Sequence, residues 1–151
     1  MDERPTPILV VSNHGAVVGG GELSMLELLR GLDRRRWAPA LVVPVDGAVA
    51  AHGRDLGLPI HVVPLPTLRR HGYAMASSVR MLGRLARTTG AALIHANGSR
   101  AMMYGGLAGR TTGRPAVWHV RIAQSDGVIV PKRARMNASS SGCSGVVCPW
   151  R

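Results

Sequence analysis

The chain has 151 residues, of which 46% are hydrophobic and 3% aromatic, with no Phe. This composition excludes a disordered chain and predicts a core built from Val, Leu, Ile, Ala and Met. The formal net charge of +11 indicates either an anionic partner or a solvated basic surface. No apolar run approaches the roughly 20 residues that a membrane-spanning helix needs.

The first predicted strand, residues 7–12, is a short and continuously apolar run, which is typical of a strand buried on both faces of a parallel sheet. A loop with four glycines follows over residues 13–21, and residues 22–32 are predicted to form a helix. Four apolar residues of that helix are spaced to lie on one face: Met25, Leu28, Leu29 and Leu32.

Strands and helices then alternate along the next part of the chain. Further strands are predicted over residues 38–45, 60–63, 91–96 and 115–120, and further helices over residues 47–56, 74–88 and 99–109. In helix 74–88, one face carries Met75, Val79, Leu82 and Leu85, and the other carries Arg80, Arg84 and Arg87. The alternation predicts an α/β fold, a doubly wound and Rossmann-like parallel sheet with helices on both faces.

The alternating pattern ends near residue 121. We therefore assign residues 1–121 to one Rossmann-like domain and residues 122–151 to an irregular tail. The tail contains a low-complexity stretch, residues 137–145, and the two cysteines, Cys143 and Cys148. Two explanations stay open: a disordered tail, or loss of the original reading frame between about residues 122 and 137.

The cysteines and histidines do not form a metal-binding pattern. Cys143 and Cys148 are spaced neither as zinc ligands nor as a redox motif, and the six His are scattered along the chain. We therefore expect no bound metal and a protein of the reducing cytoplasm.

The loop after the first strand is the first candidate site. Gly19, Gly20 and Gly21 would let the backbone approach a phosphate, and the helix that follows directs its free N–H groups at the same place. Glu22 lies in the first turn of that helix, where a carboxylate is also favourable for structural reasons alone. The loop is neither a P-loop nor a Gly-x-Gly-x-x-Gly motif, which disfavours a nicotinamide cofactor. A glycine turn needed only for its geometry is the alternative.

The ends of the fourth and fifth strands supply further polar residues, at the edge where such sheets bind ligands. Residues 97–99 are expected to cap the next helix, and His95 to be a core histidine. His119 and Arg121 are two residues apart and therefore share one side of the fifth strand. Imidazole can act as an acid, a base or a hydrogen-bond donor, and guanidinium can hold a phosphate. His14, in the first loop, is a further candidate.

Together these features resemble the N-terminal domain of GT-B glycosyltransferases of the family 4-like group. The matching segments are the strand of residues 8–12, the loop Gly19-Gly20-Gly21-Glu22 with its helix, and the strand ends at residues 94–97 and 115–119. The resemblance covers about residues 6–125, and the order and spacing of the motifs make it more specific than any one motif.

The resemblance implies hexosyl transfer from a nucleotide-sugar donor to a lipid-linked or carbohydrate acceptor, with no metal or other cofactor. By the same resemblance, Gly19 and Gly20 would lie against the donor diphosphate and His119 beside the transferred sugar. Arg121 stands where many members carry an acidic residue, which leaves its role open. Residues 56–125 hold nine Arg and no Asp or Glu. This stretch fits a phosphorylated or membrane-bound acceptor, and hence peripheral contact with the inner face of a membrane.

The family's donor-binding half, with its paired glutamates seven residues apart, has no counterpart, because no Glu follows Glu27. Stabilisation of the leaving diphosphate comes largely from that half, so we expect a truncated enzyme that is inactive alone. A non-enzymatic phosphate- or nucleotide-binding Rossmann module is the alternative. Nucleic-acid binding through the basic surface is disfavoured, because aromatic residues are few and no nucleic-acid-binding motif is found.

Overall fold

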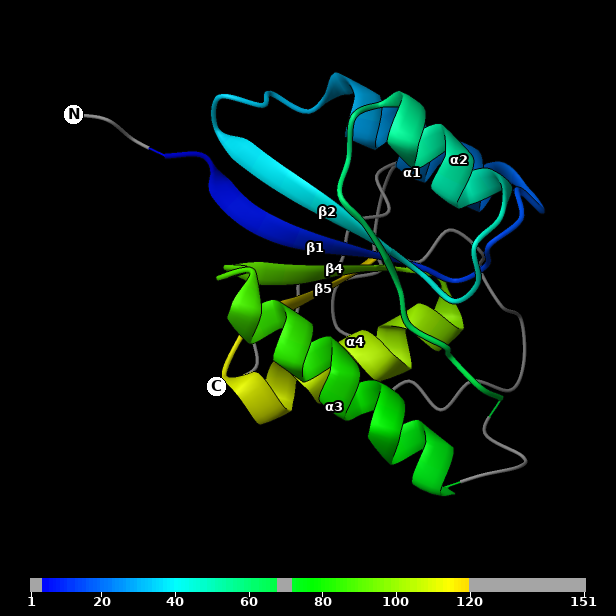
Figure 1. Cartoon of the computed structure of the whole chain (residues 1–151), viewed down its shortest axis with the longest axis vertical. Helices are drawn as coiled ribbons and strands as arrows, with labels where there is room; N and C mark the ends of the chain where they lie inside the picture. Colours follow the sequence, from blue (N-terminus) through cyan, green and yellow to red (C-terminus); the bar gives the residue numbers. More distant parts are fainter. Residues whose placement is uncertain (1–3, 68–71, 120–151) are drawn as a thin grey trace, which may run out of the picture.

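The computed structural model describes residues 4–67 and 72–119 of the chain, in which five strands alternate with four helices (Figure 1). The strands are β1 (Thr6–Ser12), β2 (Trp37–Val43), β3 (Ile60–Val62), β4 (Leu93–Asn97) and β5 (Ala116–His119). The helices are α1 (Gly20–Gly31), α2 (Ala48–Asp55), α3 (Gly72–Thr88) and α4 (Ser99–Thr112). Each element overlaps its predicted range. Arg121 and the predicted tail, residues 122–151, lie outside the described residues.

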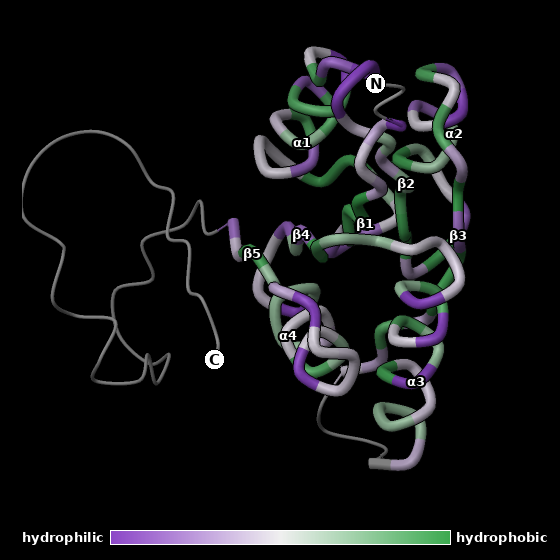
Figure 2. Tube along the Cα trace, turned by 90° about the vertical axis from the view of Figure 1, so that its left-hand side faces the viewer, coloured by the Kyte–Doolittle hydropathy of each residue, from purple (hydrophilic) through white to green (hydrophobic). Residues whose placement is uncertain are grey.

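All five strands are parallel, in the order β3-β2-β1-β4-β5. Helices α1 and α2 cover one face of the sheet, and α3 and α4 cover the other (Figures 1 and 2). The predicted doubly wound, Rossmann-like fold is thereby confirmed. Because the strand order reverses between β1 and β4, the crevice beyond their carboxyl ends is the place where such folds bind ligands.

Strand β1 lies at the centre of the sheet and is buried on both faces. Leu9 and Val11 belong to the core under α3 and α4, and Ile8 and Val10 belong to the core under α1 and α2. Successive side chains of a strand point to opposite faces, so a strand covered on both sides needs an uninterrupted apolar run. The predicted strand has that run, and Figure 2 shows it in hydrophobic colours between the two helical layers.

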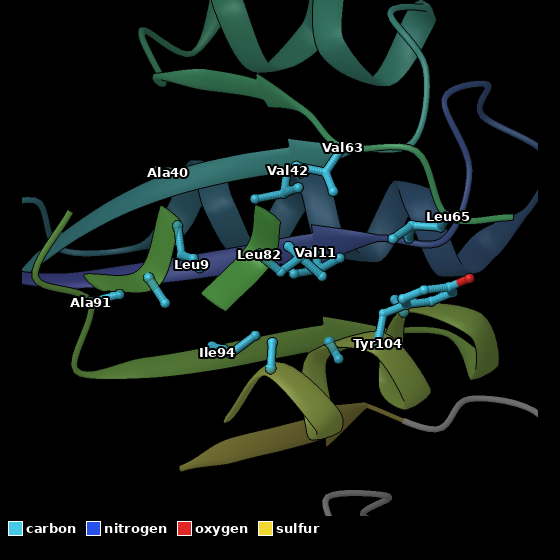
Figure 3. Close-up of a cluster of buried hydrophobic side chains, with 14 residues drawn as sticks. Leu9, Val11, Ala40, Val42, Val63, Leu65, Leu82, Ala91, Ile94 and Tyr104 are labelled. Atoms are coloured by element: carbon cyan, nitrogen blue, oxygen red, sulfur yellow. The ribbon is translucent and has the colours of Figure 1, made fainter. Parts of the chain in front are cut away.

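The core under α3 and α4 contains the fully buried side chains of Leu82 and Tyr104 (Figure 3). The Tyr104 hydroxyl donates a hydrogen bond of 2.7 Å to the carbonyl oxygen of Pro66, which ties the segment after β3 to α4. Burial raises the pKa of that hydroxyl. On the other side of α3 the predicted basic face is exposed: Arg80, Arg84 and Arg87.

Helix α1 buries a different stripe from the predicted one. Its buried residues are Glu22, Met25, Leu26 and Leu29, whereas Leu28 is 43% exposed. The buried residues still have the spacing of one helix face, but the first of them is the acidic residue Glu22. Apolar residues lie on more than one face of this segment, and the docking of the helix on the sheet decides which of them are covered.

Candidate functional site

The last residues of three neighbouring strands form a row at the carboxyl edge of the sheet. Ser12 of β1 pairs with Asn97 of β4, and Asn97 pairs with His119 of β5. Trp118 packs against the core under α3 and α4, so His119 faces the other side of the sheet, which α1 covers. The row and the start of α1 therefore lie on the same face, next to the switch point.

His95 places a second imidazole beside the one that the sequence singles out. It lies two residues before Asn97 and therefore on the same face of β4. The ring centroids of His95 and His119 are 5.7 Å apart, with an angle of 60° between the ring planes. This separation is within the range of an aromatic pair. His95 is half-buried, so it is a partner of His119 rather than a fully enclosed core residue.

The glycine turn, residues 19–21, forms the start of α1 and opens to space. A Cβ atom added at any of the three positions would have no atom within 4 Å. None of the three has a positive φ, so neither packing nor backbone conformation requires glycine there. No side chain of the described residues caps α1. The N–H groups of its first turn are thus available to a ligand or to water.

At Gly15, in the same loop, packing against the rest of the protein requires glycine. A Cβ atom at Gly15 would collide with the side chain and the carbonyl group of Val45. The carbonyl oxygen of Gly15 accepts a hydrogen bond of 2.9 Å from the backbone N–H of Val49, which ties the loop to α2. A purely geometric role for glycine therefore fits Gly15 but not residues 19–21.

A hydrogen bond between His14 and Glu22 joins the two ends of this loop. The distance from His14 Nδ1 to Glu22 Oε1 is 3.0 Å. Glu22 is only 5% exposed, whereas the His14 side chain is 40% exposed. The sequence offers both residues as separate candidates and does not pair them. Eight positions along a loop and a helix start correspond to no regular spacing that would bring two side chains together.

The cap of α4 comes from a residue that sequence reasoning missed. Asn13 Oδ1 accepts the backbone N–H groups of Arg100 at 2.9 Å and of Ala101 at 3.2 Å. The N-cap residue is Gly98, within the expected residues 97–99, but with φ of 96° and no side chain it supplies no capping oxygen of its own. The side-chain cap instead crosses from Asn13, directly after β1, to α4 at the switch point. Only the position of an Asn directly after a buried strand could have suggested it.

Two residues of the row hold the backbone of the loop. Asn97 Nδ2 donates a hydrogen bond of 3.2 Å to the carbonyl oxygen of Gly21. Ser12 Oγ donates one of 2.8 Å to the carbonyl oxygen of His14. Since Ser12 and Asn97 are partners in the sheet, both ends of the loop are anchored to adjacent strands.

The surface has a hollow of about 540 Å³ elsewhere, at the amino edge of the sheet. It is lined by Pro7, Trp37 and Pro59 among others, and it forms because β3 pairs only with residues 41–43 of β2. It shares no residue with the row or the loop at the carboxyl edge.

In the described parts of the chain, no three His, Cys, Asp or Glu side chains are grouped as a metal site would need. No helix there is long and apolar enough to cross a membrane.

The model of glycosyltransferase family 4 matches residues 18–149, which is most of the chain. The chain belongs to glycosyltransferase family 4. The described part of this family 4 chain has the fold of the N-terminal Rossmann-like domain of a GT-B glycosyltransferase, as its motifs predicted. No curated protein matches the sequence.

Several solved structures share the fold of the family 4 chain. Anabaena HepE in complex with UDP and glucose has a TM-score of 0.60 and 24% identity, over 75% of this chain and 29% of HepE. MurG from Acinetobacter baumannii has a TM-score of 0.61 and 18% identity, over 76% of this chain and 35% of MurG. A glycosyltransferase from Rickettsia africae has a TM-score of 0.61 and 14% identity, over 77% of this chain and 30% of that protein. The family 4 chain thus spans about a third of the length of these proteins.

Proposed function

We propose that this chain forms the acceptor-side half of an enzyme that transfers a hexosyl group from a nucleotide-sugar donor to an acceptor. The observation that carries the proposal is the glycine turn. Its three glycines are required neither by packing nor by φ, and they open at a helix N-terminus beside the switch point. A close approach by a ligand is the physical reason that is left for glycine at these positions.

In this proposal the turn receives the donor diphosphate. The N–H groups and the positive end of the α1 dipole favour an anion, and the absent Cβ atoms let its oxygens come close to the backbone. His119 lies beside the transferred sugar, with His95 next to it, and Arg121 contributes a positive charge. Glu22 supports the donor site indirectly and does not contact the donor, because its carboxylate is buried and hydrogen-bonded to His14.

HepE, which has the same fold, is described in complex with UDP and glucose and with UDP-glucose. UDP-glucose is therefore the first donor to test. Transfer needs groups that stabilise the leaving diphosphate, and the glycine turn supplies only part of that stabilisation. We accordingly propose that the 151-residue chain binds the donor weakly, with a dissociation constant on the order of 1 mM, and has no turnover alone.

The acceptor is proposed to be lipid-linked or a carbohydrate, reached at the cytoplasmic face of a membrane. The support is electrostatic, since the described residues after Asp55 include no Asp or Glu and several exposed Arg. Such a surface attracts phosphorylated groups and anionic lipids. Binding to vesicles that contain anionic lipid, but not to neutral vesicles, is the expected result.

The test is a titration of the 15N-labelled chain with UDP-glucose and with UDP, followed by NMR. We expect the largest shifts at the amides of residues 19–22 and at His119, and no release of UDP when acceptor lipid or oligosaccharide is added. Shifts confined to the amino-edge hollow would place the ligand elsewhere and contradict the proposal. Turnover by the chain alone would overturn its predicted inactivity. Equal binding of UDP, UDP-glucose and inorganic phosphate would favour the non-enzymatic binding module.

A further inference from the structure

The imidazole of His14 is engaged by the protein at Nδ1 and on one face of the ring. Nδ1 lies 3.0 Å from Glu22 Oε1, and Nε2 lies 3.1 Å from Asn13 Nδ2. The distance from Asn13 Nδ2 to the other ring nitrogen is longer, at 3.4 Å. His14 is thus held between the residue before it in the loop and a residue of the helix after the loop.

The helix cap determines which way the Asn13 amide points. Its oxygen accepts two backbone N–H groups of α4, from Arg100 and Ala101, so its nitrogen faces His14. Because this nitrogen is nearly equidistant from the two ring nitrogens, it lies over the face of the imidazole and leaves the Nε2 lone-pair direction open. An ionised Glu22 can only accept, so Nδ1 carries the proton of the His14–Glu22 hydrogen bond.

We propose that His14 is a positioning residue of the donor site, which acts through its Nδ1–H hydrogen bond to Glu22. The ligand part of this inference rests on the function proposed above. The Nδ1–H group bridges the base of the loop that carries the glycine turn, from residue 14 to residue 22. Nδ1 is therefore unavailable for proton transfer unless its hydrogen bond to Glu22 breaks.

The bridge matters because the loop that it closes is rich in glycine. Three successive glycines have more conformations to lose than any other residues, and a ligand that must order them binds more weakly. The His14–Glu22 hydrogen bond, together with the bond from Asn97 to the Gly21 carbonyl, holds the turn before the ligand arrives. Both bonds attach it to the edge of the sheet and to α1.

Two substitutions of His14 separate positioning from direct contact. In His14→Asn, the side-chain nitrogen takes the place of Nδ1 and can still donate to Glu22. In His14→Gln, the nitrogen takes the place of Nε2, and the short bridge to Glu22 is lost. We expect the affinity for UDP-glucose to stay within about twofold in His14→Asn and to fall about threefold to tenfold in His14→Gln.

Equal losses in both variants would overturn the inference, since a residue that contacts the ligand through Nε2 is not replaced by Asn. Glu22 gives a matched pair as well. Glu22→Gln keeps an oxygen that accepts the Nδ1 proton and should retain the affinity, whereas Glu22→Ala should lose it. If neither Glu22 variant differs from the wild type, the bridge does not position the turn.

Two measurements need no ligand and separate this inference from the proposed function. The 15N shifts of the His14 ring should report the Nδ1–H tautomer, and an Nε2–H tautomer would overturn the assignment. Amide hydrogen exchange at residues 19–22 should be faster in His14→Gln than in His14→Asn. If the wild type binds no UDP-glucose, the proposed function fails, while the ring shifts and the exchange rates still decide the role of His14.

Discussion

Gly20→Ala is the most direct test of the glycine turn. Gly20 is the first residue of α1, its φ is not positive, and an added Cβ atom would have no atom within 4 Å. The methyl group therefore costs no packing energy in the free protein. Alanine also loses less chain entropy than glycine on folding, so we expect a stabilisation of about 0.5–1 kcal/mol. In thermal unfolding this corresponds to a rise in Tm of about 2–5 °C.

The same methyl group would stand where the donor diphosphate is proposed to approach the backbone. We expect the affinity for UDP-glucose to fall at least about fivefold, which is close to 1 kcal/mol of binding free energy. Gly31→Ala is the matched control. It adds a methyl group to the other end of the same helix, where a Cβ atom also has no neighbour within 4 Å. This control should leave the affinity unchanged.

Circular dichroism melts give the Tm of each variant, and NMR titration gives its affinity. A more stable Gly20→Ala that binds UDP-glucose as well as Gly31→Ala does would refute the reasoning, because the ligand would then not approach the turn. A fall in the Tm of Gly20→Ala would instead refute the premise that the space beside Gly20 is empty.

Three further predictions concern the frame of the site. Leu29→Ala should lower the free energy of unfolding in urea by about 2–5 kcal/mol and Leu28→Ala by under about 1 kcal/mol, and similar losses would contradict the buried stripe of α1. Asn13→Ala should cost about 0.5–2 kcal/mol through loss of the α4 cap, whereas Asn13→Asp keeps the accepting oxygen and should cost less in the same assay. The hydrogen-bonded Arg54 guanidinium lowers the pKa of the Asp46 carboxyl, so this pair stabilises the fold above pH about 4 and the contribution is lost as the pH falls through the lowered pKa. Arg54→Gln should return the Asp46 pKa, measured by NMR, to its ordinary value, and an unmoved pKa would rule out this cause.

The sheet and its helices follow from local patterns and were predictable. A buried parallel strand needs only its own apolar run, which residues 7–12 contain, and an amphipathic helix needs only its own spacing, which α3 contains. The stripe of α1 was less predictable. Leu28 and Leu26 are equally apolar, and only the docking of the helix on the sheet exposes the first and buries the second.

The candidate site depends on contacts that local patterns do not encode. The cap of α4 joins Asn13 to Arg100 across the switch point, and a search for caps near the helix start finds residues 97–99 instead. Likewise, the sequence alone does not distinguish the roles of Gly15 and Gly20, which lie in the same predicted loop. They differ because Val45 fills the space beside the first, while no atom lies near the second.

The central place of β1 has a consequence for how the chain is made. Ile8 pairs with Pro39 on one side, and on the other side with Leu93, which leaves the ribosome much later. Until β4 is synthesised, the most apolar strand of the sheet has one unpaired edge, and such edges bind other unfinished chains. A ribosome that stalls before residue 93 would therefore release an aggregation-prone intermediate. The yield of this protein should then depend on the speed of translation between β3 and β4 more than on the stability of the finished domain.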